Sequence, residues 1–81
     1  MAAVIPNPRR RVIAAVNATG RDGRVYTLMM RAGGEVVGRR VGVNQNGNPF
    51  HMFSVRRRVH SAFRDLETLT YIAELKGYTP Q

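Results

Sequence analysis

The sequence predicts a small α+β domain in which an antiparallel meander of three or four strands is followed by one C-terminal α-helix. Alternating runs separated by glycine-rich turns indicate the strands, and apolar residues at helical spacing near the C-terminus indicate the helix. The length of 81 residues allows one small domain and no second one. We place this domain at residues 11–78, between an extended basic arm at 1–10 and a tail at 79–81.

The arm at residues 1–10 is predicted from its prolines. Pro6 and Pro8 disfavour a helix and lack the backbone N–H group that a sheet would use. Three consecutive arginines follow Pro8 directly, so the arm ends in a cluster of positive charge.

Three strands are expected at residues 11–19, 24–32 and 35–44. The Asp22-Gly23 pair between the first two is a strong hairpin signal. The Gly33-Gly34 pair between the second and third supplies the positive φ angles that a tight turn needs. Short turns of this kind join strands that are neighbours in an antiparallel sheet, which predicts the meander.

The segment 50–63 allows two interpretations, and the sequence leaves both open. With a period of two residues, Phe53, Val55 and Val59 share one face, which predicts a fourth strand. With a period of 3.6, one apolar stripe runs from Val55 into the later helix, with Ser54 as its N-cap. Three arginines in the first turn of that longer helix count against it, because a helix N-terminus carries partial positive charge.

A helix over residues 66–76 is expected in either case. Asp65 suits its start, and Glu67 in the first turn and Lys76 in the last turn complement the helix dipole. Gly77 provides the stop, since glycine adopts the left-handed conformation that often ends a helix.

The chain is strongly basic, with 13 Lys and Arg against 5 Asp and Glu, a formal net charge of +8 and a pI of about 11.5. Twelve of the cations are arginines, whose planar guanidinium group binds phosphate through two donors. Residues 1–64 carry +10, from twelve arginines and two acids, whereas residues 65–81 carry −2, from one lysine and three acids. A polyanionic partner on the sheet side is therefore expected.

Eight arginines form three clusters, at 9–11, 39–40 and 56–58. Alternate residues of each run point to opposite faces of a strand, so no cluster lies wholly on one face. Arg31 and Arg39 are expected to lie near each other across the second hairpin. The candidate nucleic-acid-binding residues are Arg9, Arg10, Arg11, Arg31, Arg39, Arg40, Arg56, Arg57 and Arg58.

These clusters predict a non-enzymatic basic nucleic-acid-binding protein that contacts the phosphates of DNA or RNA. Tyr26, Phe50 and Phe53 are the aromatic candidates for base stacking. The alternation of Tyr26 with Leu28 and Met30, however, is more typical of a core face. Phosphate contacts position a nucleic acid without specifying its sequence, so no sequence specificity is implied.

Catalysis, a metal site and a cofactor are not predicted. No spacing among the five acids suggests a general acid–base pair, and no acid is placed to orient His51 or His60. The chain has no cysteine, and two histidines nine residues apart match no familiar metal-ligand spacing. The glycine pairs fit hairpin turns rather than phosphate-binding loops.

The alternative function is that of a small accessory or inhibitor protein of a phage or other mobile element, which docks an acidic surface of a larger host machine. It would use the same arginines or the helix, whose wide apolar arc also suits a homodimer. A structural component of a ribonucleoprotein or virion is a third alternative. No run approaches the roughly 18 apolar residues that span a bilayer, so we expect a cytoplasmic protein without a membrane partner. The candidate protein-interface residues are Leu69, Tyr71, Ile72 and Leu75.

Overall fold

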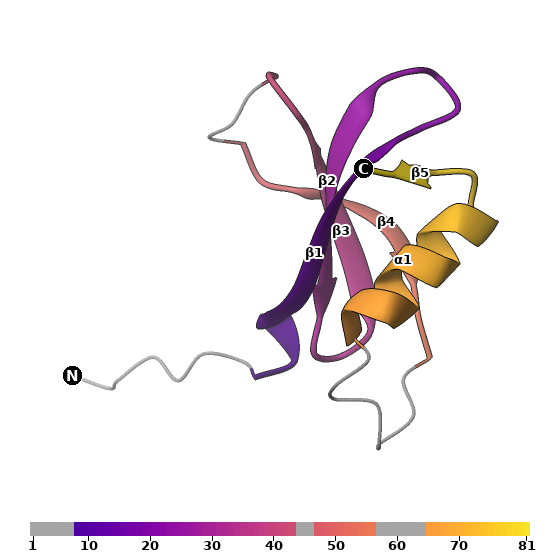
Figure 1. Cartoon of the computed structure of the whole chain (residues 1–81). Coiled ribbons are helices and arrows are strands. Elements are labelled where there is room, and N and C mark those ends of the chain that lie inside the picture. Colours follow the sequence, from indigo (N-terminus) through magenta and orange to yellow (C-terminus); the bar gives the residue numbers. More distant parts are fainter. Residues whose placement is uncertain (1–7, 44–46, 57–64) are drawn as a thin grey trace.

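A five-stranded antiparallel sheet forms the body of the molecule, and one helix lies against one of its faces (Figure 1). This computed structural model describes residues 8–43, 47–56 and 65–81. The strand order is β4-β3-β2-β1-β5, so the first four strands form a meander, and the predicted α+β fold is confirmed. The elements are a 3-10 helix η1 (Pro8–Arg10), β1 (Val12–Thr19), β2 (Val25–Arg31), β3 (Glu35–Arg40), β4 (Phe50–Ser54), α1 (Asp65–Leu75) and β5 (Thr79–Pro80).

The segment for which the sequence allowed two interpretations begins as a strand. β4 pairs with β3, and the alternating residues Phe53 and Val55 are buried at 9% and 8% exposure. Ser54 is the last residue of β4 and not the N-cap of a helix, so the longer helix is wrong, and the helix that the structure describes is Asp65–Leu75. Residues 57–64, including Arg57 and Arg58, lie outside the described residues.

Two glycine turns set the register of the meander. Gly23 (φ +78°) and Gly34 (φ +92°) both occupy the left-handed region, and the second of these agrees with the positive φ predicted for the Gly33-Gly34 turn. A Cβ atom on Gly34 would also collide with the backbone carbonyl of Val55, whose N–H group donates to the Gly34 carbonyl at 2.7 Å. This close approach holds the end of β4 against the β2–β3 turn.

Helix α1 ends at a Schellman motif, in which two N–H groups beyond the helix bond back to its last turn. The Tyr78 N–H donates to the Ala73 carbonyl at 2.9 Å, and the Gly77 N–H donates to the Glu74 carbonyl at 3.0 Å. Gly77 takes a φ of +96°, as expected for the residue that stops the helix. No helix in the described part of the chain combines the length and the apolar character needed to cross a membrane.

The three C-terminal residues are not the free tail that the sequence suggested. The reversal at the end of α1 brings Thr79 opposite Thr19 and Pro80 opposite Ala18, which forms the short fifth strand at the outer edge of β1. The Gln81 N–H also donates to the backbone carbonyl of Asn17 at 2.9 Å. Proline is tolerated there because an edge strand needs no donor on its outer side.

The core lies between α1 and the face of the sheet that we call the covered face. Alternate residues of the inner strands point toward the helix, including Leu28 and Met30 of β2, which are fully buried. The core cluster comprises Ala18, Leu28, Met30, Val36, Phe53, Val55, Leu69 and Ala73.

The opposite side of the sheet, which we call the open face, has no helix packed on it among the described residues. Its centre is apolar, with Met29 half-buried and Val37 only 3% exposed. A hydrogen bond from the Thr27 hydroxyl to the Asn17 side-chain oxygen, 2.8 Å long, crosses the β1–β2 pair on this face. By strand register, the open face carries Ala15, Asn17, Thr27, Met29, Arg31, Glu35, Val37, Arg39 and His51.

Candidate nucleic-acid interface

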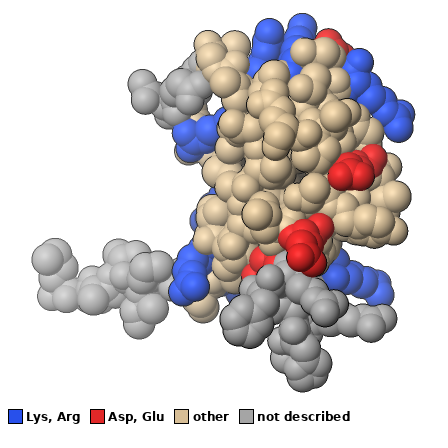
Figure 2. Space-filling model, viewed as in Figure 1, with Lys and Arg blue, Asp and Glu red and all other residues tan. Residues whose placement is uncertain are grey.

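The described cations gather at two opposite ends of the sheet. Figure 2 shows Lys and Arg in the upper and lower parts of the molecule, with uncharged surface and some Asp and Glu between them. Five cations lie at each end, and together they include every Lys and Arg among the described residues. We name the two groups the arm cluster and the hairpin cluster.

The arm cluster surrounds the β2–β3 turn. Backbone hydrogen bonds from Ala32 to the Arg11 carbonyl (2.8 Å) and from Gly33 to the Arg9 carbonyl (3.0 Å) hold η1 beside this turn. The bond between Val55 and Gly34 brings the end of β4 to the same place. The members of the arm cluster are Arg9, Arg10, Arg11, Arg31 and Arg56.

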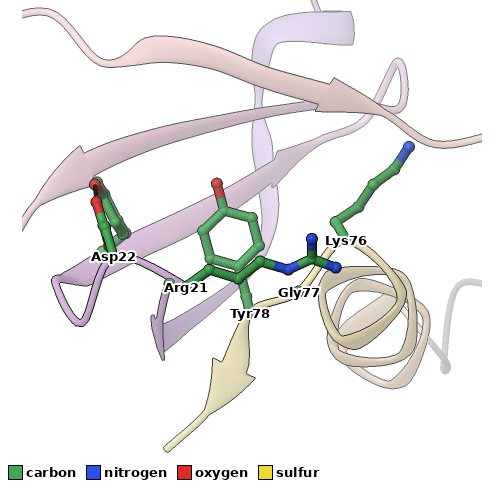
Figure 3. A pocket seen from close by; sticks show the side chains of 7 residues that line it. Arg21, Asp22, Lys76, Gly77 and Tyr78 are labelled. Carbon is green, nitrogen blue, oxygen red and sulfur yellow. Dashed lines mark hydrogen bonds between the residues drawn. The ribbon is translucent and has the colours of Figure 1, made fainter.

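The hairpin cluster surrounds the β1–β2 turn at the other end of the sheet. The Val41 N–H donates to the Val25 carbonyl at 2.9 Å, which fixes the end of β3 beside this turn. The helix C-terminus reaches the same end, where the Arg21 guanidinium lies against Gly77 (Figure 3). The members of the hairpin cluster are Arg21, Arg24, Arg39, Arg40 and Lys76.

The prediction that Arg31 and Arg39 lie near each other across the second hairpin is wrong. Arg39 pairs with Thr27 near the start of β2, whereas Arg31 lies at the end of β2 beside the β2–β3 turn. At a rise of about 3.3 Å per residue, four residues along the strand separate them by about 13 Å. Both side chains belong to the open face, but one lies in each cluster.

The two clusters are separated by the length of β2. Its seven residues span about 20 Å at 3.3 Å per residue. The open face is the surface between the clusters that no described helix covers. A polyanion that joined the two clusters on the covered side would have to pass over α1. This helix carries three acids that repel a polyanion: Asp65, Glu67 and Glu74.

Glu35 partly neutralises the arm cluster on the open face. Its carboxylate accepts a hydrogen bond from the Arg31 guanidinium at 2.7 Å and lies 3.1 Å from Nδ1 of His51. The His51 ring, followed by Arg31, holds the pKa of the Glu35 carboxyl below its usual value. The charges of Arg31 and Glu35 therefore cancel at this corner of the sheet.

Asp22 has the same effect on the hairpin cluster. It accepts a 2.6 Å hydrogen bond from the Tyr26 hydroxyl and a 3.0 Å bond from the Arg24 backbone N–H. These two bonds lower the pKa of Asp22, and the same carboxylate raises the pKa of Tyr26. Each cluster therefore contains one carboxylate whose ionised form is stabilised by its neighbours.

A hollow of about 220 Å³ lies between the β1–β2 turn and the helix C-terminus (Figure 3). The Arg21 side chain extends across it toward Gly77, where the last helical carbonyls carry partial negative charge. Arg21 therefore joins the hairpin to the helix end, and the nearby Asp22 makes this hollow a poor site for an anion. The remaining lining residues are Gly20, Tyr26, Lys76 and Tyr78.

A second hollow, of about 160 Å³, lies where the chain leaves β3 and enters β4. Two arginines of the hairpin cluster contribute to its wall, and the Phe50 ring beside them is 47% exposed. It is lined by Arg39, Arg40, Val43, Gly47, Asn48 and Phe50. The sequence pointed to these arginines and to Phe50 separately, but loop closure between β3 and β4 is needed to bring them together.

By strand register all three aromatic candidates belong to the covered face, with Phe50 opposite Gly38 at the start of β4. Phe53 is buried, and the ring of Tyr26 makes an edge contact with Tyr78, at 6.0 Å between centroids. The alternation of Tyr26 with Leu28 and Met30 therefore predicted correctly that Tyr26 lies on the core side of the sheet. Among the described residues, strand register places no aromatic side chain on the open face. Nucleic-acid bases therefore have no described aromatic ring to stack on along that face.

The predicted protein-interface residues separate into two groups. Leu69 is fully buried in the core, because it lies on the helix side that faces the sheet, so it is not available to a partner. Ile72 is half-buried and packs on the same core. Tyr71 and Leu75 are each 61% exposed on the outer side of α1. They are one turn apart and are therefore neighbours on the helix surface.

No three side chains of His, Asp or Glu in the described part of the chain lie close enough to hold a metal ion. Comparison of the chain with protein-family models gave no match, and neither did comparison with curated proteins or with solved structures. Function must therefore be inferred from the placement of its charged, aromatic and exposed apolar side chains.

Proposed function

We propose that the chain is a non-enzymatic nucleic-acid-binding protein that receives a phosphate backbone across the open face. The observation that carries this proposal is the division of the ten described cations between two clusters about 20 Å apart, joined by a face without a helix. Three of the five acids lie instead on α1, on the other side of the sheet. Such a dipolar charge distribution orients a polyanion toward one face.

The spacing of the clusters suits several phosphates of one strand. Each strand of a duplex carries one phosphate per 3.4 Å of helix axis, so roughly six nucleotide steps cover 20 Å of that axis. Between the clusters the strand would pass over Thr27, Met29 and Val37, which carry no charge. Binding would therefore depend on the two ends of the sheet and be tolerant of sequence.

The test is a binding series by fluorescence anisotropy with single-stranded DNA, duplex DNA and RNA at several salt concentrations. If each cluster neutralises two phosphates, the logarithm of the binding constant of a single strand falls against the logarithm of salt with a slope of about −3. Absence of binding at low salt, or an affinity that hardly changes with salt, would contradict the proposal.

A second candidate function is protein binding through the helix, as expected of a small accessory or inhibitor protein that docks a larger machine. The observation that favours it is the pair Tyr71 and Leu75, each 61% exposed on the outer side of α1. Light scattering after size-exclusion chromatography tests whether the partner is a second copy. A dimer that Leu75→Glu converts to a monomer would support self-association, and a wild-type monomer at all concentrations would exclude it.

A further inference from the structure

The hollow between β3 and β4 places arginine side chains beside an aromatic ring. Phosphate binding requires the arginines but not the ring. Its volume is about 160 Å³, and its wall includes two arginines and an exposed aromatic ring. Pockets that hold a drug-sized ligand measure about 300–1,000 Å³, so this one suits a single flat ring. None of the described residues that line it is acidic.

The Phe50 ring is held in place but not covered. It makes an edge contact with Tyr26, with the ring centroids 6.2 Å apart and the planes at 85°. Its exposed fraction of 47% leaves nearly half of the residue in contact with solvent. An aromatic ring fixed on one side and exposed on another is prepared to stack with a second flat group.

The neighbouring side chains supply the remaining contacts that a nucleotide needs. The guanidinium groups of Arg39 and Arg40 bind phosphate, and guanidinium also stacks on bases. The Asn48 amide has both donors and an acceptor, which can bond to the edge of a base. The same hollow therefore offers separate partners to the ring, the edge and the phosphate of one nucleotide.

We infer that this hollow binds one unpaired nucleobase, stacked on Phe50, together with its phosphate. The bases of an intact duplex are stacked on their neighbours and cannot enter, so the chain binds single strands or unpaired strand ends in preference to duplex. This inference rests on the proposed function, because it assigns a base-stacking site to the nucleic acid that the two clusters attract.

The test uses the absence of tryptophan from the chain. Phe50→Trp places one fluorescent reporter in the hollow, and Tyr71→Trp places the matched control on the outer side of α1. Both full-length variants are titrated with a twelve-residue oligodeoxythymidine and with an abasic oligonucleotide of the same length and charge. We expect the thymidine strand to quench Phe50→Trp but not Tyr71→Trp, and to bind roughly fivefold or more tightly than the abasic strand.

A companion variant, Phe50→Leu, removes the stacking ring while leaving an apolar side chain, and circular dichroism confirms its fold. It should bind the thymidine and abasic strands equally well. Equal quenching of Phe50→Trp by both strands, or a base preference that survives in Phe50→Leu, would overturn the base site. The phosphate-binding function would stand in those cases. It would fail separately if wild-type protein bound neither strand at low salt.

Discussion

The covered and open faces differ in chemistry although they alternate along the same strands. Met30 points into the core with no exposed surface, whereas its neighbour Met29 lies half-buried on the open face. On the covered face, apolar side chains and α1 exclude water and supply the stability of the fold. Among the described residues of the open face, the cations lie toward the two ends of the strands, and the centre carries no charge. In such a small domain one face can therefore be used for stability and the other kept for a partner.

The largest expected effect is a difference in stability between variants of the covered face and variants of the open face. Leu28→Ala on the covered face removes a fully buried side chain, which costs about 2–5 kcal/mol of the free energy of unfolding. Met29→Ala on the open face should cost clearly less, because Met29 already keeps part of its contact with water. Urea denaturation of both variants measures the difference. Equal losses would show that the open face is packed as tightly as the core.

The next largest effect is a difference in nucleic-acid binding between a variant that lacks a cation of the open face and one that lacks a cation elsewhere. Arg39→Gln on the open face should weaken binding of a single-stranded oligonucleotide several-fold and reduce the salt slope by about 0.7. Lys76→Gln is the matched control, because Lys76 belongs to the same hairpin cluster but follows α1 and does not lie on the open face, so it should change the slope less. Anisotropy titrations at several salt concentrations give both values. A larger loss in Lys76→Gln would place the interface on the helix side.

Glu35→Gln should strengthen binding. It removes the carboxylate that partly neutralises Arg31 and His51, so the arm cluster gains one unit of positive charge. We expect the affinity for a single strand to rise about two- to fivefold at low salt and the gain to disappear as salt screens the charge. Unchanged affinity would mean that the Arg31 end of the open face does not touch the nucleic acid.

The smallest effect is on stability at acidic pH. His51 and Arg31 lower the pKa of Glu35 below its usual 4.5, so the folded state favours the ionised carboxylate. That stabilisation is complete above pH 4.5 and is lost as the pH falls through the lowered pKa. Thermal unfolding of Glu35→Gln should therefore differ from wild type above pH 4.5 and converge with it in acid. A difference that grows as the pH falls would contradict the ion pair.

Features that depend on local chemistry were predictable from the sequence. The pairs Asp22-Gly23 and Gly33-Gly34 mark two turns because each contains a glycine that takes a positive φ angle. Gly77 marks the end of the helix for the same reason. Strand alternation also gave the correct face of Tyr26.

Features that depend on pairing between distant segments were not predictable. β5 exists because the turn at Gly77 returns the chain to β1, and two residues carry no strand pattern of their own. The contact of Glu35 with His51 depends on the irregular register between β3 and β4. The clustering of arginines at two ends, instead of along one face, likewise follows from register and from the position of η1.

The adjacent methionines of β2 allow the most direct test of binding on the open face. With methyl-labelled methionine, an NMR titration with a single-stranded oligonucleotide records Met29 and Met30 separately, one on each face of the same strand. We predict that the Met29 methyl signal shifts progressively while the Met30 signal stays in place. A shift of Met30 without Met29, or saturable binding that moves neither signal, would contradict binding across the open face.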